Sequence, residues 1–473
     1  MTYKPVYNKV SDENIKDLID MTSPERVFVK DAINLDYYHD EMPEYGKYPP
    51  EAVVEVLTTE EVSNIMRYCW ERSIPVVPRG SGTGLCGGAV AKFGGVMLST
   101  AKMNKVIGID MNNLTITVEP GLMLMELAAI VQEKGLLYPP DPGEKSATIG
   151  GNVMTNAGGM RAVKYGVTRD YVRAMEVVLS DGTVINLGSN VAKNSSGYSL
   201  LDILIGSEGT LGFVTKITLE LIPLPKRSVS LLVPFPDLDK CIDTVPKFFE
   251  NKLIPTTLEF MQREVIMAAE EYLGKVFPDK GSDAYLILSF DGNTKEETDS
   301  ICDSVAQVCL DCGAEDVFIS DTEERKEAIW SARGAFLEAI KSSTPAMDEC
   351  DVVVPRDRIA DFVKFVNGLE KECEIRIRSF GHAGDGNIHV YVCKDDLEED
   401  VWMERLNKVM KKMYDKAEEM GGQVSGEHGI GHAKVGYLEQ SLGEKNIQIM
   451  EGIKAAFDPK FILNPGKVYC DKI

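Results

Sequence analysis

The 473-residue chain lacks any apolar run long enough to span a bilayer, and no apolar stretch follows its first charged residues. These absences argue against a membrane helix and a secretory signal, so we expect a cytoplasmic protein. Positive charge is also scarce, since 51 lysine and arginine residues stand against 74 acidic residues, a net charge of −23. Nucleic acids and anionic membrane surfaces attract basic proteins, and the composition therefore argues against both as partners.

Cysteine is present, but a disulfide framework is not. The ten cysteines are scattered, and in a reducing cytoplasm we expect free thiols. The one CxxC pair, Cys309 and Cys312, has no second pair beside it. Because Gly313 follows, we interpret the pair as the end of a helix; an iron–sulfur or redox role is the alternative.

Histidine is rare, and its few copies are clustered. Four of the five histidines fall between residues 382 and 432. His382 and His389 flank the sequence Gly-Asp-Gly-Asn, which is strong turn chemistry, and strand-like residues 375–379 and 388–392 lie on either side. A hairpin here brings the two imidazoles together, and such a pair suits a borderline divalent metal.

The other two clustered histidines, His428 and His432, lie in a second glycine-rich loop. Glu427 precedes His428 in this loop, between glycines, so it supplies a carboxylate beside an imidazole. We interpret Glu427 as a metal ligand rather than as a solvated acid. His432 is left out of the predicted site because either an outer-shell or a surface role fits it.

Glycine is concentrated in residues 78–88, which hold five glycines and a literal GxGxxG. A Rossmann site requires a helix to open within such a loop. Here Gly94 and Gly95 follow, and then a strand, so we reject the Rossmann interpretation. A loop of this kind aims successive N–H groups at an anion, and we predict a phosphate cradle.

Two more segments, residues 138–159 and 205–215, are rich in glycine, hydroxyls and side-chain amides. Small residues leave room for a flat ligand, and the polar groups can bond to its heteroatoms. Strands separate the three segments. One long ligand lying across all of them is predicted, and FAD has the required length and a diphosphate.

These motifs resemble those of a known family. Residues 78–85 (PRGSGTGL), 148–159 (TIGGNVMTNAGG) and 206–212 (GSEGTLG) are similar to the flavin-binding segments of the vanillyl-alcohol-oxidase-type FAD domain. Together with the histidine loops and residues 464–467 (NPGK), they resemble the FAD-linked D-lactate, glycolate and D-2-hydroxyglutarate dehydrogenases. Thr83 stands where some relatives carry a histidine for a covalent flavin bond, so the resemblance implies non-covalent FAD.

The resemblance implies which residues contact the cofactor. They come from the three glycine-rich segments and the C-terminal motif: Pro78, Arg79, Gly80, Ser81, Gly82, Thr83, Gly84, Pro142, Gly143, Thr148, Gly150, Gly151, Asn152, Asn156, Gly158, Gly159, Glu208, Gly209, Gly212, Val214 and Asn464.

An α+β fold of two main parts is expected. We predict an N-terminal arm of polar helices over residues 1–45 and a two-part FAD-binding domain over 46–224. A cap or substrate domain with an antiparallel sheet and helices on one side follows over 225–420. Residues 421–473 then complete the active site and return to the FAD domain.

The chemistry implied by the family assigns roles to five residues. His382, His389 and Glu427 are predicted to hold zinc, iron or manganese, with positions left open for a chelating 2-hydroxy acid. His428 is the predicted base for the hydroxyl proton. Arg333, on a predicted helix over 326–333, is the predicted partner of the substrate carboxylate.

The substrate and the electron acceptor are less defined by the sequence. Longer-substrate relatives carry a lysine near the position of Asp348, Glu349 and Cys350, and acids there favour D-lactate first and glycolate next. With no second nucleotide fold, we expect no NAD. The resemblance implies that electrons pass to a protein such as electron-transfer flavoprotein, in some relatives within an electron-bifurcating complex. The alternatives are a quinone-linked dehydrogenase, an ether-lipid-synthase-like flavoenzyme and a non-catalytic flavin subunit.

Overall fold

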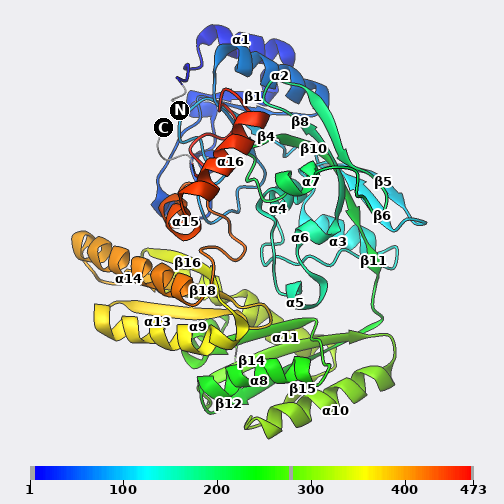
Figure 1. Cartoon of the computed structure of the whole chain (residues 1–473), viewed down its shortest axis with the longest axis vertical. Coiled ribbons are helices and arrows are strands. Elements are labelled where there is room, and N and C mark those ends of the chain that lie inside the picture. Colours follow the sequence, from blue (N-terminus) through cyan, green and yellow to red (C-terminus); the bar gives the residue numbers. More distant parts are fainter. Residues whose placement is uncertain (1–5, 276–280, 470–473) are drawn as a thin grey trace.

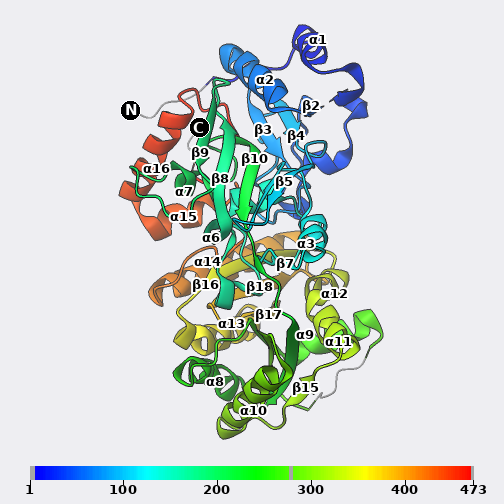
Figure 2. The same cartoon turned by 90° about the vertical axis from the view of Figure 1, so that its right-hand side faces the viewer.

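The computed structural model describes residues 6–275 and 281–469, and it divides into two lobes that meet across one face (Figures 1 and 2). The upper lobe in Figure 1 contains the first 220 or so residues together with the C-terminal helices α15 (Val435–Leu442) and α16 (Glu444–Phe457). The lower lobe contains most of the chain between them. The α+β fold of the sequence prediction is confirmed.

The upper lobe contains two sheets. The smaller has strand order β1-β2-β4-β3, and its last three strands are parallel. Its elements are α1 (Asp12–Met21), β1 (Val27–Val29), β2 (Ala52–Glu55), α2 (Thr59–Arg72), β3 (Val76–Arg79) and β4 (Val96–Ser99). The absence of a helix between β3 and β4 agrees with the rejection of a Rossmann site.

The larger sheet of this lobe is antiparallel, with order β5-β6-β10-β8-β9. Its strands are β5 (Val106–Asp110), β6 (Thr115–Val118), β8 (Val172–Val178), β9 (Val184–Gly188) and β10 (Phe213–Glu220). A two-stranded ribbon joins β7 (Leu136–Leu137) to β11 (Ile222–Pro223). The helices between strands are α3 (Leu124–Gln132), α4 (Ile149–Thr155), α5 (Ala162–Tyr165), α6 (Thr168–Tyr171) and α7 (Leu200–Leu204).

The lower lobe is built on a seven-stranded antiparallel sheet of order β15-β12-β14-β13-β17-β18-β16. Its strands are β12 (Arg227–Phe235), β13 (Thr257–Gln262), β14 (Ala284–Gly292), β15 (Phe318–Ser320), β16 (Met347–Val353), β17 (Arg376–His382) and β18 (Asn387–Cys393). Its helices are α8 (Leu238–Glu250), α9 (Arg263–Leu273), α10 (Lys295–Asp311), α11 (Glu323–Gly334), α12 (Phe336–Ser342), α13 (Ile359–Cys373) and α14 (Glu399–Glu419).

Alternation along these strands gives the sheet two different faces. Val229, Leu231 and Val233 of β12 join a large apolar core under α8, α10, α13 and α14. The intervening Leu232 belongs to a second cluster, which contains residues of α9, α11 and α12. The prediction of helices on one side only is therefore wrong: a second apolar cluster on the opposite face needs its own helices.

Two other local predictions are also corrected. The N-terminal arm is not helical throughout, since Val27–Val29 pairs with β2 and extends the first sheet. The segment 148–159, predicted as a loop, contains helix α4, whose N-terminus is capped by Thr148 Oγ1 accepting the Gly151 N–H at 3.3 Å. The glycines lower the helix propensity of this segment, so the sequence did not indicate a helix. The N-cap and tertiary packing offset that low propensity.

The histidine hairpin forms as predicted, between β17 and β18. Its turn requires glycine at position 386, where φ is +90° and a Cβ would lie 2.0 Å from the Val354 carbonyl oxygen. His389 pairs with Phe380 on one side and Asp351 on the other, and His382 pairs with Glu259 on β13. The pairing places all four polar side chains on the sheet face that meets the upper lobe.

We expect Gly386→Ala to destabilise the protein by more than the ~1–3 kcal/mol of an ordinary left-handed residue, because it adds a clash with Val354. Gly421→Ala is the matched control: φ there is +79°, but the added Cβ has open space around it. Urea unfolding of both variants measures the difference. If Gly386→Ala and Gly421→Ala lost the same free energy of unfolding, the predicted clash with Val354 would be contradicted.

Candidate active site

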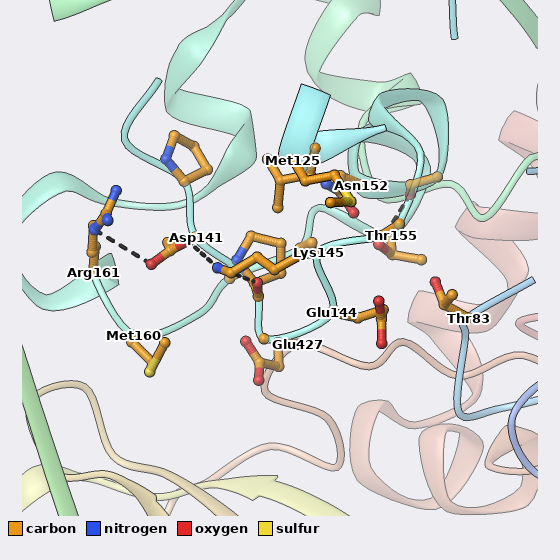
Figure 3. A pocket seen from close by; sticks show the side chains of 18 of the residues that line it. Thr83, Met125, Asp141, Glu144, Lys145, Asn152, Thr155, Met160, Arg161 and Glu427 are labelled. Atoms are coloured by element: carbon orange, nitrogen blue, oxygen red, sulfur yellow. Dashed lines mark hydrogen bonds and ion pairs between the residues drawn. The ribbon is translucent and has the colours of Figure 1, made fainter. Parts of the chain in front are cut away.

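A cavity of about 1440 Å³ lies between the lobes and is lined by both (Figure 3). The upper lobe contributes the loop after β3, helix α4 and the start of β10. The lower lobe contributes one side of α11 and the polar face of the sheet. The cavity is larger than a typical small-ligand pocket, which suits a dinucleotide and a substrate together.

Most of the predicted cofactor residues line this cavity. The lining includes Pro78, Arg79, Gly80, Ser81, Gly82, Thr83, Gly84, Pro142, Gly143, Thr148, Gly150, Gly151, Asn152, Gly158, Glu208, Gly209, Gly212 and Val214. Asn156, Gly159 and Asn464 lie outside it. Asn464 instead donates from Nδ2 to the Gly88 and Glu208 carbonyls, at 2.9 and 2.7 Å, and so joins two of the glycine-rich segments.

The lining has features that a flavin would fit. At Gly143, a Cβ would meet nothing within 4 Å, and at Gly84 only an Asp40 oxygen at 3.8 Å, so both leave open space at the cavity wall. Nδ2 of Asn152 is buried and has no hydrogen-bond partner among the described residues. A buried amide of this kind is expected to bond to something that fills the cavity.

Two predicted cofactor residues have side chains committed elsewhere. The Arg79 guanidinium donates to the carbonyls of Asp36, His39 and Ala89 at 2.8–3.0 Å, so it anchors the N-terminal arm beneath the loop. Glu208, with φ of +52°, accepts from the N–H groups of residues 430 and 431 at 2.8 and 2.7 Å. Only the backbone of these two residues is left to face a cofactor.

At the lower-lobe end, three ligand atoms form a nearly equilateral triangle. Nε2 of His382 lies 3.3 Å from Nε2 of His389, and both lie 3.4 Å from Oε1 of Glu427. A tetrahedral ion with bonds of about 2.0–2.1 Å has ligand atoms separated by about 3.3–3.4 Å. The three predicted ligands therefore fit a divalent metal, with a fourth position toward the cavity that all three line.

Burial and neighbouring charges shift the pKa values of all three residues of the triangle. The carboxylates of Glu259 and Glu427 raise the pKa of His382 well above 6.5, although burial opposes the shift. Burial alone would raise the pKa of Glu427, but the charge of His382 holds it well below 4.5. For His389, burial dominates and lowers the pKa to about 4. A cation bound by the triangle would compete with protons for these ligand atoms.

Glu259 joins the metal triangle to Arg333. Its Oε1 lies 2.6 Å from Nδ1 of His382, and its Oε2 accepts from the Arg333 guanidinium at 2.6–2.8 Å. Glu259 is fully buried, and Arg333 is 8% exposed and lines the cavity. The sequence analysis placed Arg333 at the site but missed Glu259, the one acid of strand β13.

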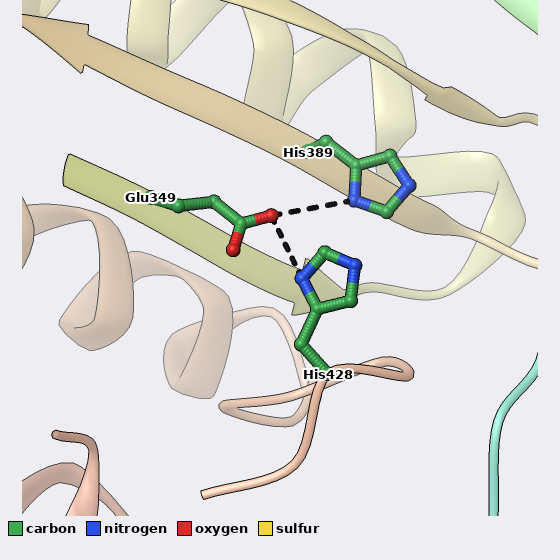
Figure 4. A group of neighbouring side chains, drawn as sticks. All are labelled: Glu349, His389 and His428. Atoms are coloured by element: carbon green, nitrogen blue, oxygen red, sulfur yellow. Dashed lines mark ion pairs between the residues drawn. The ribbon is translucent and has the colours of Figure 1, made fainter. Parts of the chain in front are cut away.

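A second group of possible metal ligands competes with the first. Glu349, His389 and His428 also converge, with Glu349 Oε1 at 2.7 Å from Nδ1 of His428 and 3.9 Å from Nδ1 of His389 (Figure 4). A neutral imidazole has one lone pair, so His389 cannot serve both groups at once. Glu349 does not line the cavity, and buried Lys434 contributes a positive charge near it. The cavity-facing triangle is therefore the better cation site.

Sequence patterns of two families of flavoprotein domains match the chain. The FAD binding domain matches residues 50–188, and the C-terminal domain of FAD linked oxidases matches residues 224–468. These matches and the cavity define the class as FAD-dependent oxidoreductases.

Among curated relatives, the chain is 52% identical to D-lactate dehydrogenase of Anaerostipes hadrus, over 99% of both chains. It is 40% identical to glycolate oxidase subunit GlcD of Bacillus subtilis, over 96% of both chains. A solved structure of p-cresol methylhydroxylase superposes with a TM-score of 0.81 at 19% identity, covering 99% of both chains, and shares the vanillyl-alcohol-oxidase-type fold. The chain belongs to the family of FAD-linked D-lactate, glycolate and 2-hydroxyglutarate dehydrogenases.

A helix that crosses a bilayer must be both long and apolar. No helix within residues 6–275 and 281–469 has both properties.

We expect His382→Ala to lose a bound divalent metal, because it removes one corner of the triangle. Metal content after exposure to zinc, iron or manganese, and removal of the excess, measures this. His39→Ala is the control, since His39 bonds to the Asp40 carbonyl in the arm and not to the triangle. Equal metal content in the two variants would contradict the site.

Proposed function

We propose that this enzyme oxidises a short 2-hydroxy acid, D-lactate first and glycolate next, to the 2-oxo acid. The observation that carries the proposal is the triangle of His382, His389 and Glu427, which opens into the same cavity as the flavin-binding segments. The relatives named D-lactate dehydrogenase and glycolate oxidase subunit support the substrate class.

The residues then divide the chemistry. When bound, FAD accepts a hydride, and a divalent ion on the triangle lowers the pKa of the substrate hydroxyl. His428, whose Nε2 lies 3.6 Å from Glu427 Oε1 and whose ring lines the cavity, takes the hydroxyl proton. Arg333 binds the substrate carboxylate with the part of its guanidinium that Glu259 leaves available.

The acids near residue 349 give less support for a short substrate than their position in the sequence suggests. Neither Asp348 nor Glu349 lines the cavity. Neither acid therefore contacts a substrate in the cavity, and the substrate length rests on the relatives' names.

The electron acceptor in our proposal is another protein, with electron-transfer flavoprotein as the first candidate. The strong negative charge of the chain favours a partner with a basic docking face. A flavin-bifurcating assembly is one setting for such a transfer. A quinone is the competing acceptor.

The central test uses the purified chain reconstituted with FAD and a divalent metal. We expect flavin absorption in the visible range, and bleaching of that absorption by D-lactate or glycolate without oxygen. Turnover with an artificial dye should follow and should stop with a chelator, because the hydroxyl then loses its Lewis acid. Retained flavin with no turnover of D-lactate, glycolate or D-2-hydroxyglutarate would favour a non-catalytic flavin subunit instead.

We expect Arg333→Lys to raise KM about tenfold or more, with a smaller effect on kcat, since lysine keeps the charge opposite Glu259 but loses the planar fork that binds a carboxylate. Steady-state kinetics with the dye acceptor measures both constants. Arg378→Lys is the control, because Arg378 pairs with Glu370 outside the cavity. An unchanged KM in Arg333→Lys would remove Arg333 from the substrate site.

A further inference from the structure

Strand β16 carries two acids that face the active-site loop 425–428. Glu349 and Asp351 are two residues apart, so their side chains project from the same face of the sheet. Both are fully buried, and neither lines the cavity. Buried carboxylates are costly unless they are paired, and each of these has a specific partner in the loop.

Asp351 holds the backbone of the loop. Its Oδ2 accepts four hydrogen bonds at 2.9–3.1 Å, and its Oδ1 accepts a fifth, at 2.7 Å, from the Asn387 side chain. The four donors on Oδ2 are the Ser425 hydroxyl and the N–H groups of Gly426, Glu427 and His428. Successive N–H groups around one anion form a rigid nest, so the loop cannot shift without breaking several charge-assisted bonds.

Glu349 holds the ring of His428. In the described part of the chain, neither of its carboxylate oxygens has a hydrogen-bond partner, and its shortest contact to an ionisable group is Oε1 to Nδ1 of His428 at 2.7 Å. Figure 4 shows the carboxylate beside the ring, pointing at this nitrogen. The negative charge this close to Nδ1 favours the ring proton on that nitrogen and leaves Nε2 to face the reacting hydroxyl.

We propose that Asp351 and Glu349 are positioning residues with separate tasks. Asp351 places the backbone that carries Glu427 and His428, whereas Glu349 orients the ring of His428 and selects its tautomer. The proposal rests on the proposed function for the role of His428 as base. The part that concerns Asp351 does not depend on His428 being the base. Asp351 positions Glu427, and its effect is on metal binding alone.

The separate tasks predict separate defects. Asp351→Asn replaces one oxygen of the nest by an amide, so it should displace Glu427 and weaken metal binding about 10- to 100-fold, as loss of an outer-shell partner commonly does. Glu349→Gln should leave metal affinity within about threefold. It should lower kcat about tenfold or more with little change in KM, because a base contributes roughly 10²–10⁴-fold when correctly held.

Asp348→Asn is the matched control. Asp348 is on the same strand between the lobes, but its carboxylate accepts from Tyr45 of the arm at 2.6 Å and from the Glu349 N–H at 2.7 Å. Oδ1 accepts both bonds, so the amide oxygen of an asparagine in the same rotamer can keep both. Metal affinity and kcat of this variant should stay within about threefold of the native protein.

The experiment compares the native protein and the three variants, all loaded with FAD. Zinc affinity is measured by competition with a chromophoric chelator, and kcat and KM with D-lactate and a dye at saturating metal. The expected pattern is weak zinc binding in Asp351→Asn only, and a low kcat in Glu349→Gln at full zinc occupancy. Thermal unfolding shows whether any defect follows a general loss of stability.

Two results would overturn the inference: native zinc affinity in Asp351→Asn, or equal defects in Asp348→Asn and the other two variants. Native kcat in Glu349→Gln would remove the ring-orienting role. If the native protein itself turns over no 2-hydroxy acid, the proposed function fails. The zinc affinities of Asp351→Asn and Asp348→Asn still decide whether Asp351 positions the metal loop.

Discussion

The active site depends on how one short loop, residues 425–431, is held between two lobes. On the lower side, Asp351 binds three consecutive N–H groups of the loop. On the upper side, the Glu208 carboxylate binds two more, at residues 430 and 431. Asp351 is buried and Glu208 is partly buried, and hydrogen bonds to a carboxylate shielded from water are strong and directional. Glu427 and His428 are therefore placed by contacts from both domains rather than by the loop itself.

A second chain of buried charges supports the same site from the sheet. Arg333 pairs with Glu259, and Glu259 contacts His382, so the proposed carboxylate partner and a metal ligand share one acid. Removing one member of such a network leaves the others buried and unpaired, which is more harmful than the loss of a surface pair. The upper lobe then closes the cavity, with Gly158 so near Glu427 that a Cβ there would lie 2.8 Å from Oε2.

Much of this site could be predicted from the sequence, because its parts are local. The turn between His382 and His389 is specified by its own glycines, and the hairpin forms where the turn chemistry places it. The three glycine-rich segments were predicted to share one ligand, and most of their predicted residues line one cavity. The helix that carries Arg333 was predicted as well, and Arg333 lines the same cavity. Helix α4 and strand β1 were missed, because glycine content and polarity concealed elements that only packing stabilises.

By itself, the sequence determined which residue types the chemistry uses and the order in which they occur: glycine loops first, then Arg333, two histidines on a hairpin and the Glu427–His428 pair. The tertiary structure alone decided which acids support them. Glu259 meets His382, and Asp351 meets His389, only because β13 pairs with β17 and β16 with β18 in a particular register. A shift of one residue would turn every one of these side chains to the opposite face, and that register is set by the two apolar cores on either side of the sheet.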